Sequence, residues 1–117
     1  GHRWLAPVAA ADLDGDGAVE IAYIDRPHLA KTLRVWRYLP QGLEHVADLQ
    51  GLTNHKFGWE FIAGGLRDCG GPPELILASA DWQRIMAVRL HNEELATDAI
   101  GPFTGLESIE TAMVCRS

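Results

Sequence analysis

Three aspartates at alternate positions mark the segment of this sequence with the most distinctive chemistry. The stretch from position 12 to position 20 is DLDGDGAVE, in which acids alternate with small or apolar residues. Short carboxylates at this spacing can wrap around one Ca²⁺ ion, which prefers about six to eight oxygen ligands. Without a cation, such closely spaced carboxylates would repel each other and raise each other's pKa. We therefore predict a calcium site formed by the side chains of Asp12, Asp14, Asp16 and Glu20 and by the backbone carbonyl of Ala18.

The residues that follow exclude an EF-hand. That motif needs a bidentate Glu at its twelfth position and a helix on each side of the loop. Counting from Asp12, the twelfth residue is Tyr23, which lies in an apolar run typical of a β-strand. The segment instead predicts a calcium loop between two strands, with Leu13 pointing into the core and with an ion that is structural rather than catalytic.

The sequence repeats itself with a period of about 50 residues. Residues 1–13 align without a gap with residues 54–66, and the similarity continues with VEIAYID over PELILAS and TLRVWRYLPQGL over RIMAVRLHNEEL. In the first unit, strand-like patterns cover residues 4–11, 19–24, 33–39 and 43–49, and Pro40-Gln41-Gly42 predicts a turn.

Four short antiparallel strands per unit are typical of a β-propeller blade. We expect an all-β fold with two four-stranded antiparallel blades, one in residues 1–53 and one in residues 54–104. Residues 105–117 would begin a further strand or blade. The alternative is a two-sheet β-sandwich that closes its own core. Two blades leave outer faces uncovered, so the expected partners are other propeller blades, from a larger protein or from self-association.

The loop D-x-D-G-D-G-x-x-E, followed by Ile21-Ala22, resembles the calcium loop of FG-GAP (VCBS-type) repeats. These repeats build the β-propellers of integrin α-subunits and of many bacterial exported proteins. In the second unit, Phe57-Gly58 and the segment 62–66 (IAGGL) resemble the family's FG and A-x-G-x-L lead-in. The resemblance implies a calcium-binding propeller repeat with a role in adhesion or ligand binding. Glu20 stands where the family usually has Asp.

The second loop departs from this pattern. Gly65 aligns with Asp12 and Arg67 with Asp14, so two ligands are lost and a guanidinium is gained. One hypothesis is that Arg67 acts as an internal cation that pairs with Asp68 or Glu74, because an Arg–carboxylate pair can partly replace a metal as a brace. The alternative is an exposed loop with Arg67 in water.

The remaining candidates are two histidines and two cysteines. His2 and His55 occupy equivalent places in the two units, each next to a basic residue, and could bind an anionic ligand. Cys69 and Cys115 could form one disulfide in an exported protein, or they could be unrelated thiols.

Composition excludes two classes of partner. The net charge is −6 and the basic residues are scattered singly, so a nucleic-acid partner is not expected. No apolar run approaches the roughly 20 residues that span a bilayer.

Two functions remain open. The first is a non-catalytic, calcium-stabilised module for adhesion or for binding a glycan or protein ligand. The second is part of an exported propeller enzyme, of the polysaccharide lyase or hydrolase type, with its catalytic residues mostly outside this chain. A secreted, periplasmic or cell-surface location is expected, because extracellular calcium is concentrated enough to occupy weak sites.

Overall fold

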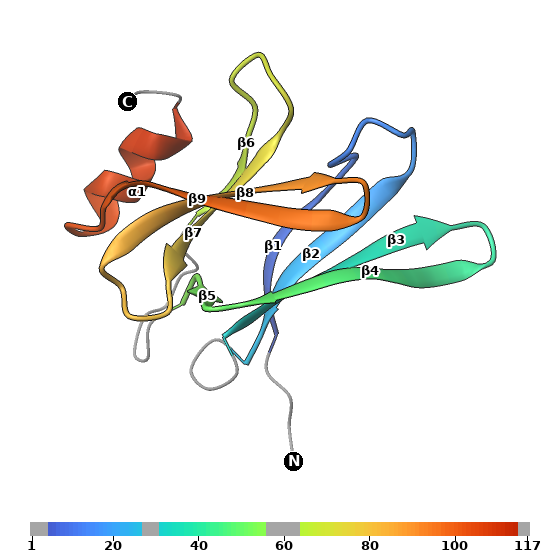
Figure 1. Cartoon of the computed structure of the whole chain (residues 1–117), viewed down its shortest axis with the longest axis horizontal. Helices are drawn as coiled ribbons and strands as arrows, with labels where there is room; N and C mark the ends of the chain where they lie inside the picture. The colour runs from blue at the N-terminus through green and yellow to red at the C-terminus, as the bar shows by residue number, and fades with distance from the viewer. Residues whose placement is uncertain (1–4, 27–30, 56–63, 115–117) are drawn as a thin grey trace.

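Two antiparallel β-sheets make up most of the protein (Figure 1). The structure is a computed structural model that describes residues 5–26, 31–55 and 64–114. The first sheet contains β1 (Leu5–Ala11), β2 (Val19–Asp25), β3 (Thr32–Leu39) and β4 (Gly42–Gln50). The second contains β5 (Leu52–Thr53), β6 (Gly65–Arg67), β7 (Glu74–Ser79), β8 (Arg84–His91) and β9 (Glu94–Pro102), and the helix α1 (Leu106–Met113) follows. The predicted all-β class is confirmed.

The first sheet is a meander in the order β1-β2-β3-β4, and its strands coincide closely with the four predicted segments. Along β3, Leu33, Val35 and Arg37 are buried, whereas Trp36 is partly exposed and Tyr38 is exposed. This alternation is the pattern of a strand with one face on the core. The chain turns between β3 and β4, where Pro40-Gln41-Gly42 predicted a turn.

The second sheet has one strand more than predicted. Both β5 and β6 pair with β7, β5 through Leu52 opposite Ser79 and β6 through Gly65 opposite Ile76. Residues 52–53 therefore belong to the second sheet, and the predicted unit boundary after residue 53 is wrong. The physical reason is Gly51, whose φ of 91° lets the chain leave β4 and cross to the second sheet.

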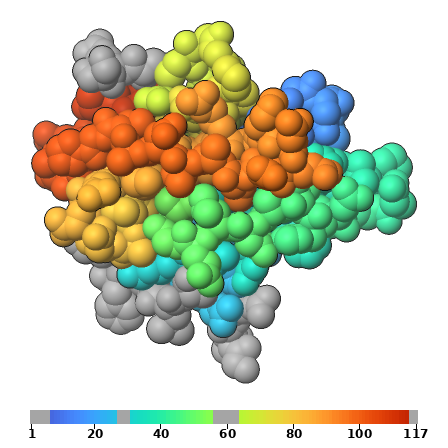
Figure 2. All heavy atoms as spheres, viewed as in Figure 1, coloured from blue at the N-terminus to red at the C-terminus, as the bar shows by residue number. Residues whose placement is uncertain are grey.

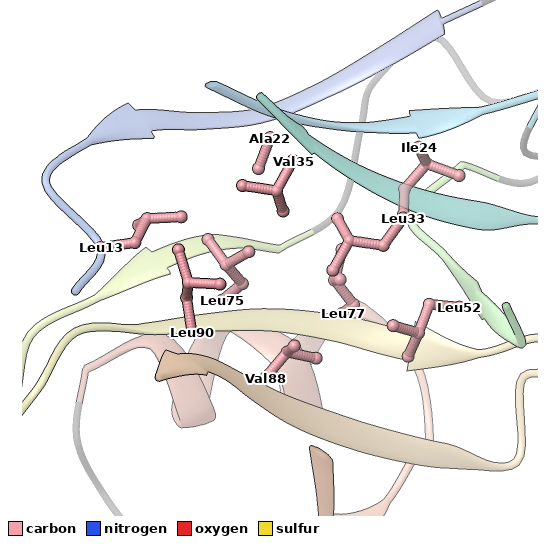
Figure 3. Packing of buried hydrophobic residues seen from close by; sticks show 10 residues of the cluster. All are labelled: Leu13, Ala22, Ile24, Leu33, Val35, Leu52, Leu75, Leu77, Val88 and Leu90. Atoms are coloured by element: carbon pink, nitrogen blue, oxygen red, sulfur yellow. The ribbon is translucent and has the colours of Figure 1, made fainter. Parts of the chain in front are cut away.

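The two sheets share a hydrophobic core (Figure 3). Leu33 and Val35 of β3 face Leu77 and Leu75 of β7, and each of these side chains is at most 1% exposed. Burying such a side chain contributes about 1.5–3 kcal/mol. The buried cluster consists of Leu13, Ala22, Ile24, Leu33, Val35, Leu52, Leu75, Leu77, Val88 and Leu90.

A further strand or blade was predicted to start in residues 105–117, but the segment after β9 forms a helix, so the prediction of a strand is wrong for residues 106–113. Leu106, Ile109, Ala112 and Met113 recur at helical spacing on one side of α1. They pack on the face of the second sheet that points away from the first sheet, where the buried residues are Ile76, Ile85 and Ala87. An amphipathic helix can cover this face with a single apolar stripe, which explains the outcome. Among the described residues, no helix is long and apolar enough to cross a membrane.

The two units align residue by residue, so each face of the first sheet has an equivalent face in the second sheet. The two equivalent faces point in the same direction. Leu33 and Val35, which face the second sheet, align with Ile85 and Ala87. Those two residues face α1. In the first sheet, this face packs against the second sheet. In the second sheet, the equivalent face packs against α1.

Within the described residues, the opposite face of the first sheet stays partly or fully exposed. Val88 and Leu90 of the second sheet face the first sheet, and they align with Trp36 and Tyr38. Tyr38 is 62% exposed, and the β3–β4 hairpin that carries it projects beyond the rest of the molecule (Figure 2). Tyr23 of β2, on this same face, is only partly buried.

Gly64 is expected to be intolerant of any side chain. Its φ is +93°, and a Cβ there would overlap the carbonyl oxygen of Ile76 in β7. Gly64→Ala should therefore lower the free energy of unfolding by about 2 kcal/mol or more, measured by urea denaturation. Gly71→Ala is the control, because a Cβ at Gly71 meets nothing within 4 Å. Equal stability of the two variants would contradict the prediction.

Candidate metal site

The four predicted side-chain ligands converge at the loop between β1 and β2. One carboxylate oxygen from each of Asp12, Asp14, Asp16 and Glu20 lies within 4.8 Å of those of the other three. Calcium–oxygen distances are about 2.3–2.6 Å, so two ligands of one ion can lie up to about 5 Å apart. The spacing and the all-oxygen donor set therefore fit a single calcium ion. We call these four residues the acidic cluster.

Backbone amides shape the loop around Asp12. Its carboxylate accepts hydrogen bonds from the N–H groups of Gly15 at 2.8 Å, Asp16 at 3.2 Å and Gly17 at 2.8 Å. The two glycines have φ values of 78° and 92°, which most other residues adopt only with strain. These hydrogen bonds, first that of Gly17, lower the pKa of Asp12 below its usual value. Asp12 is therefore held as a carboxylate at the start of the loop.

Glu20 anchors the other side of the cluster from inside the sheet. Its side chain is fully buried on β2, and its Oε1 accepts the N–H of Leu13 at 2.8 Å. Leu13 itself is 2% exposed and lies in the core, as predicted. Burial raises the pKa of Glu20. Burial also raises the pKa of Asp14, and a hydrogen bond between Asp14 and Asp16 raises it further. The fold therefore stabilises the ionised form of each of these two groups less well than water does.

Arg37 of β3 joins the acidic cluster, a contact that the spacing of the acids did not predict. Its Nη2 lies 3.1 Å from Asp14 Oδ2, and its Nε lies 3.1 Å from Glu20 Oε2 and 3.4 Å from Asp16 Oδ2. A further contact of 3.2 Å joins its Nη1 to Glu93 in the β8–β9 turn. The carboxylates, first Glu20, raise the pKa of Arg37, which stays charged.

A signal for this contact exists in the sequence. Arg37 follows Leu33 and Val35 on the core face of a strand, and Glu20 precedes Ala22 on the core face of its neighbour. A charge in a core position needs a partner of opposite charge. Glu20 and Arg37 are direct cross-strand partners in the β2–β3 ladder.

In the second sheet, Arg67 contacts one of its two predicted partners. Arg67 donates to Glu74 Oε1 from Nη2 at 2.7 Å and from Nε at 3.2 Å, and its Nη1 donates to the carbonyl of Ala112 in α1 at 3.0 Å. Asp68 instead accepts the N–H of Gly70 at 3.1 Å. The Arg67–Glu74 pair thus links the second sheet to the helix that covers it.

An acid–arginine pair recurs at the aligned positions of the two units. Glu20 pairs with Arg37 in the first sheet, and their counterparts Glu74 and Arg89 lie 3.4 Å apart in the second. The surroundings differ in charge. The acidic cluster with Arg37 has a formal net charge of −3, whereas Arg67, Asp68, Glu74 and Arg89 together are neutral. Only the first of these two loops carries an excess of negative charge.

The other predicted site residues fall outside the cluster or outside the described residues. The N–H of Ala18 donates to Asp16 at 2.9 Å, and ligation by the Ala18 carbonyl stays a prediction. His55 is 8% exposed, and His2 lies outside the described residues. Cys69 is disulfide-bonded. The chain's other cysteine, Cys115, lies outside the described residues.

Comparison of the chain with protein-family models, curated proteins and solved structures gave no match. The geometry of the acidic cluster and the stacking of the two sheets are therefore the observations that bear on function.

Proposed function

We propose that this protein is a calcium-stabilised, FG-GAP/VCBS-type β-repeat module that acts by binding other molecules rather than by catalysis. The ion would be held by the acidic cluster and would brace the corner between β1 and β2. A brace at this position would stabilise the folded state by the free energy of calcium binding. The module would work outside the cytoplasm, where calcium is concentrated enough to fill a weak site.

The net charge of the acidic cluster is the observation that carries this proposal. Three negative charges remain after Arg37 is counted, in a space where four carboxylate oxygens lie within 4.8 Å of each other. A divalent cation would reduce the net charge to about −1 and would relieve the repulsion. The corresponding region of the second sheet is already neutral, which supports one calcium site per chain.

The stacking of the sheets supports a repeat module. One face of the first sheet packs against the non-equivalent face of the second sheet, as in consecutive propeller blades. In a sandwich, the inner faces of the two sheets pack against each other. The open face of the first sheet, which includes Trp36 and Tyr38, corresponds to the face that the second sheet buries. Its proposed partner is a further unit of the same kind, and glycan or protein ligands would bind to the larger assembly.

A structural role suits the contacts of the carboxylates. Each of the four side chains accepts at least one backbone hydrogen bond or contacts Arg37. Their orientation is therefore set by the fold. Nothing in the described part of the chain favours the alternative of a propeller enzyme.

Thermal unfolding with millimolar calcium and with EDTA tests this proposal. Calcium should raise the Tm by roughly 5–15 °C, because only the folded loop binds the ion. Magnesium at the same concentration should have a much smaller effect, since it demands a tighter octahedral shell and keeps its water. The same Tm in calcium and in EDTA would contradict a structural calcium site.

A further inference from the structure

We propose that Arg37 is the resident cation of the acidic cluster, and that it couples this cluster to the second sheet. In the metal-free protein its guanidinium would hold Asp14, Asp16 and Glu20 together and tie them to Glu93. When calcium binds, the ion and the guanidinium would compete for the same carboxylates. The competition between calcium and Arg37 rests on the proposed calcium site. The coupling of the two sheets through Arg37 and Glu93 does not.

The competition follows from the atoms that Arg37 contacts. Two nitrogens of its guanidinium lie 3.1–3.4 Å from one oxygen each of Asp14, Asp16 and Glu20. These three residues supply three of the four carboxylates that could hold an ion. The side chain of Arg37 is 11% exposed, so water screens its charge only in part. A positive charge at this position must weaken the binding of a second cation.

The coupling follows from Glu93 on the other side of Arg37. Glu93 lies in the β8–β9 turn with a φ of 64°, and its Oε1 is 3.2 Å from Arg37 Nη1. A single side chain therefore connects the acidic cluster of the first sheet to a turn of the second. The aligned residue Arg89 provides the comparison. It pairs with Glu74, but its side chain is 49% exposed, whereas that of Arg37 is 11% exposed.

A double-mutant cycle in EDTA tests the coupling without metal. Arg37→Met, Glu93→Gln and the double variant are compared by urea unfolding. Arg37→Met should lower the folding equilibrium constant by about a hundredfold, because it leaves Glu20 buried without its counter-charge. Glu93→Gln should lower the folding equilibrium constant about threefold in the wild-type background. It should have no effect in the Arg37→Met background. The same effect of Glu93→Gln in both backgrounds would overturn the coupling.

Calorimetric titration with calcium tests the competition. Arg37→Met should bind calcium at least about tenfold more tightly than the wild type, because one positive charge has been removed from the cluster. Arg89→Met, the matched control in the second sheet, should bind calcium as the wild type does. An unchanged or lower affinity in Arg37→Met would overturn the competition.

Arg37→Lys separates charge from geometry and serves if Arg37→Met does not fold. Lysine keeps the positive charge but lacks the planar fork of donors. This variant should bind calcium with nearly wild-type affinity and lose the coupling to Glu93. Tighter calcium binding by Arg37→Lys, or a retained coupling, would overturn the proposal. If the wild type and all variants fail to bind calcium, the proposed calcium site and the competition for it are both wrong. The double-mutant cycle in EDTA still tests the coupling between Arg37 and Glu93.

Discussion

Replacing Asp14 with asparagine should remove most of the stabilisation that calcium gives to the wild-type protein. Asp14 is one of four carboxylates that converge on the proposed ion, and its side chain is largely enclosed. A site filled at a hundred times its Kd stabilises the folded state by about 2.7 kcal/mol. We expect Asp14→Asn to lose most of this gain, measured as the difference between urea unfolding free energies in calcium and in EDTA.

The same variant should behave in the opposite way without calcium. Burial raises the pKa of Asp14, so its ionised form lowers the stability of the folded state at neutral pH. Asparagine removes this charge and can still accept the hydrogen bond from Arg37 that Asp14 Oδ2 accepts at 3.1 Å. In EDTA, Asp14→Asn should therefore be at least as stable as the wild type.

Asp68→Asn is the matched control for Asp14→Asn. Asp68 is an exposed loop aspartate of the second sheet and lies outside the acidic cluster. Its substitution should leave the calcium effect unchanged. If Asp14→Asn retained the full calcium effect, or if Asp68→Asn lost it, the assignment of the ion to the first loop would be wrong.

Leu77→Ala should be among the most destabilising substitutions in the chain. Leu77 lies in β7 at the centre of the core between the sheets, opposite Leu33, and is 0% exposed (Figure 3). Replacing a buried leucine with alanine removes apolar contacts and leaves a cavity, at a cost of about 2–5 kcal/mol. This is a large part of the stability of an ordinary domain. Urea denaturation followed by fluorescence measures the loss.

The same variant tests whether the two sheets unfold together. A shared core should give a single cooperative transition, in the wild type and in Leu77→Ala. Leu43→Ala is the control, because this leucine is 57% exposed on the β3–β4 hairpin and its loss should cost less than about 0.5 kcal/mol. Two separate transitions, or equal costs for the two leucines, would contradict a core that joins the two units.

Local sequence patterns were sufficient to predict the strands of the first sheet and the acidic cluster. The strand-like pattern of residues 33–39 predicted β3, because side chains on a strand alternate between its two faces. The four acids fall within nine consecutive residues, so a single turn can bring them together. Both signals depend on neighbours in the sequence.

The features that were missed depend on contacts between distant residues. Arg37 reaches the cluster through the β2–β3 ladder, 17 residues from Glu20. The two residues of β5 join the second sheet only through pairing with β7. Helix α1 has only eight residues, too few to be stable alone, and it forms where an apolar sheet face needs a cover.

Alignment of the units was the most useful guide to the second loop. It placed Arg67 over Asp14 and Glu74 over Glu20, and the structure brings Arg67 to within 2.7 Å of Glu74. The same alignment also contains Arg89 over Arg37, which shows the recurring acid–arginine pair. Comparing charges at aligned positions identifies the first loop as the one with an excess of negative charge, where we propose the calcium site.

Isothermal titration of the metal-free protein with calcium tests this account most directly. The net charges of the two loops, −3 and neutral, predict one calcium ion per chain. The titration should therefore fit a single site with a stoichiometry of about one, and Asp14→Asn should remove most of its heat. Two comparable sites per chain, or no binding at millimolar calcium, would contradict the account.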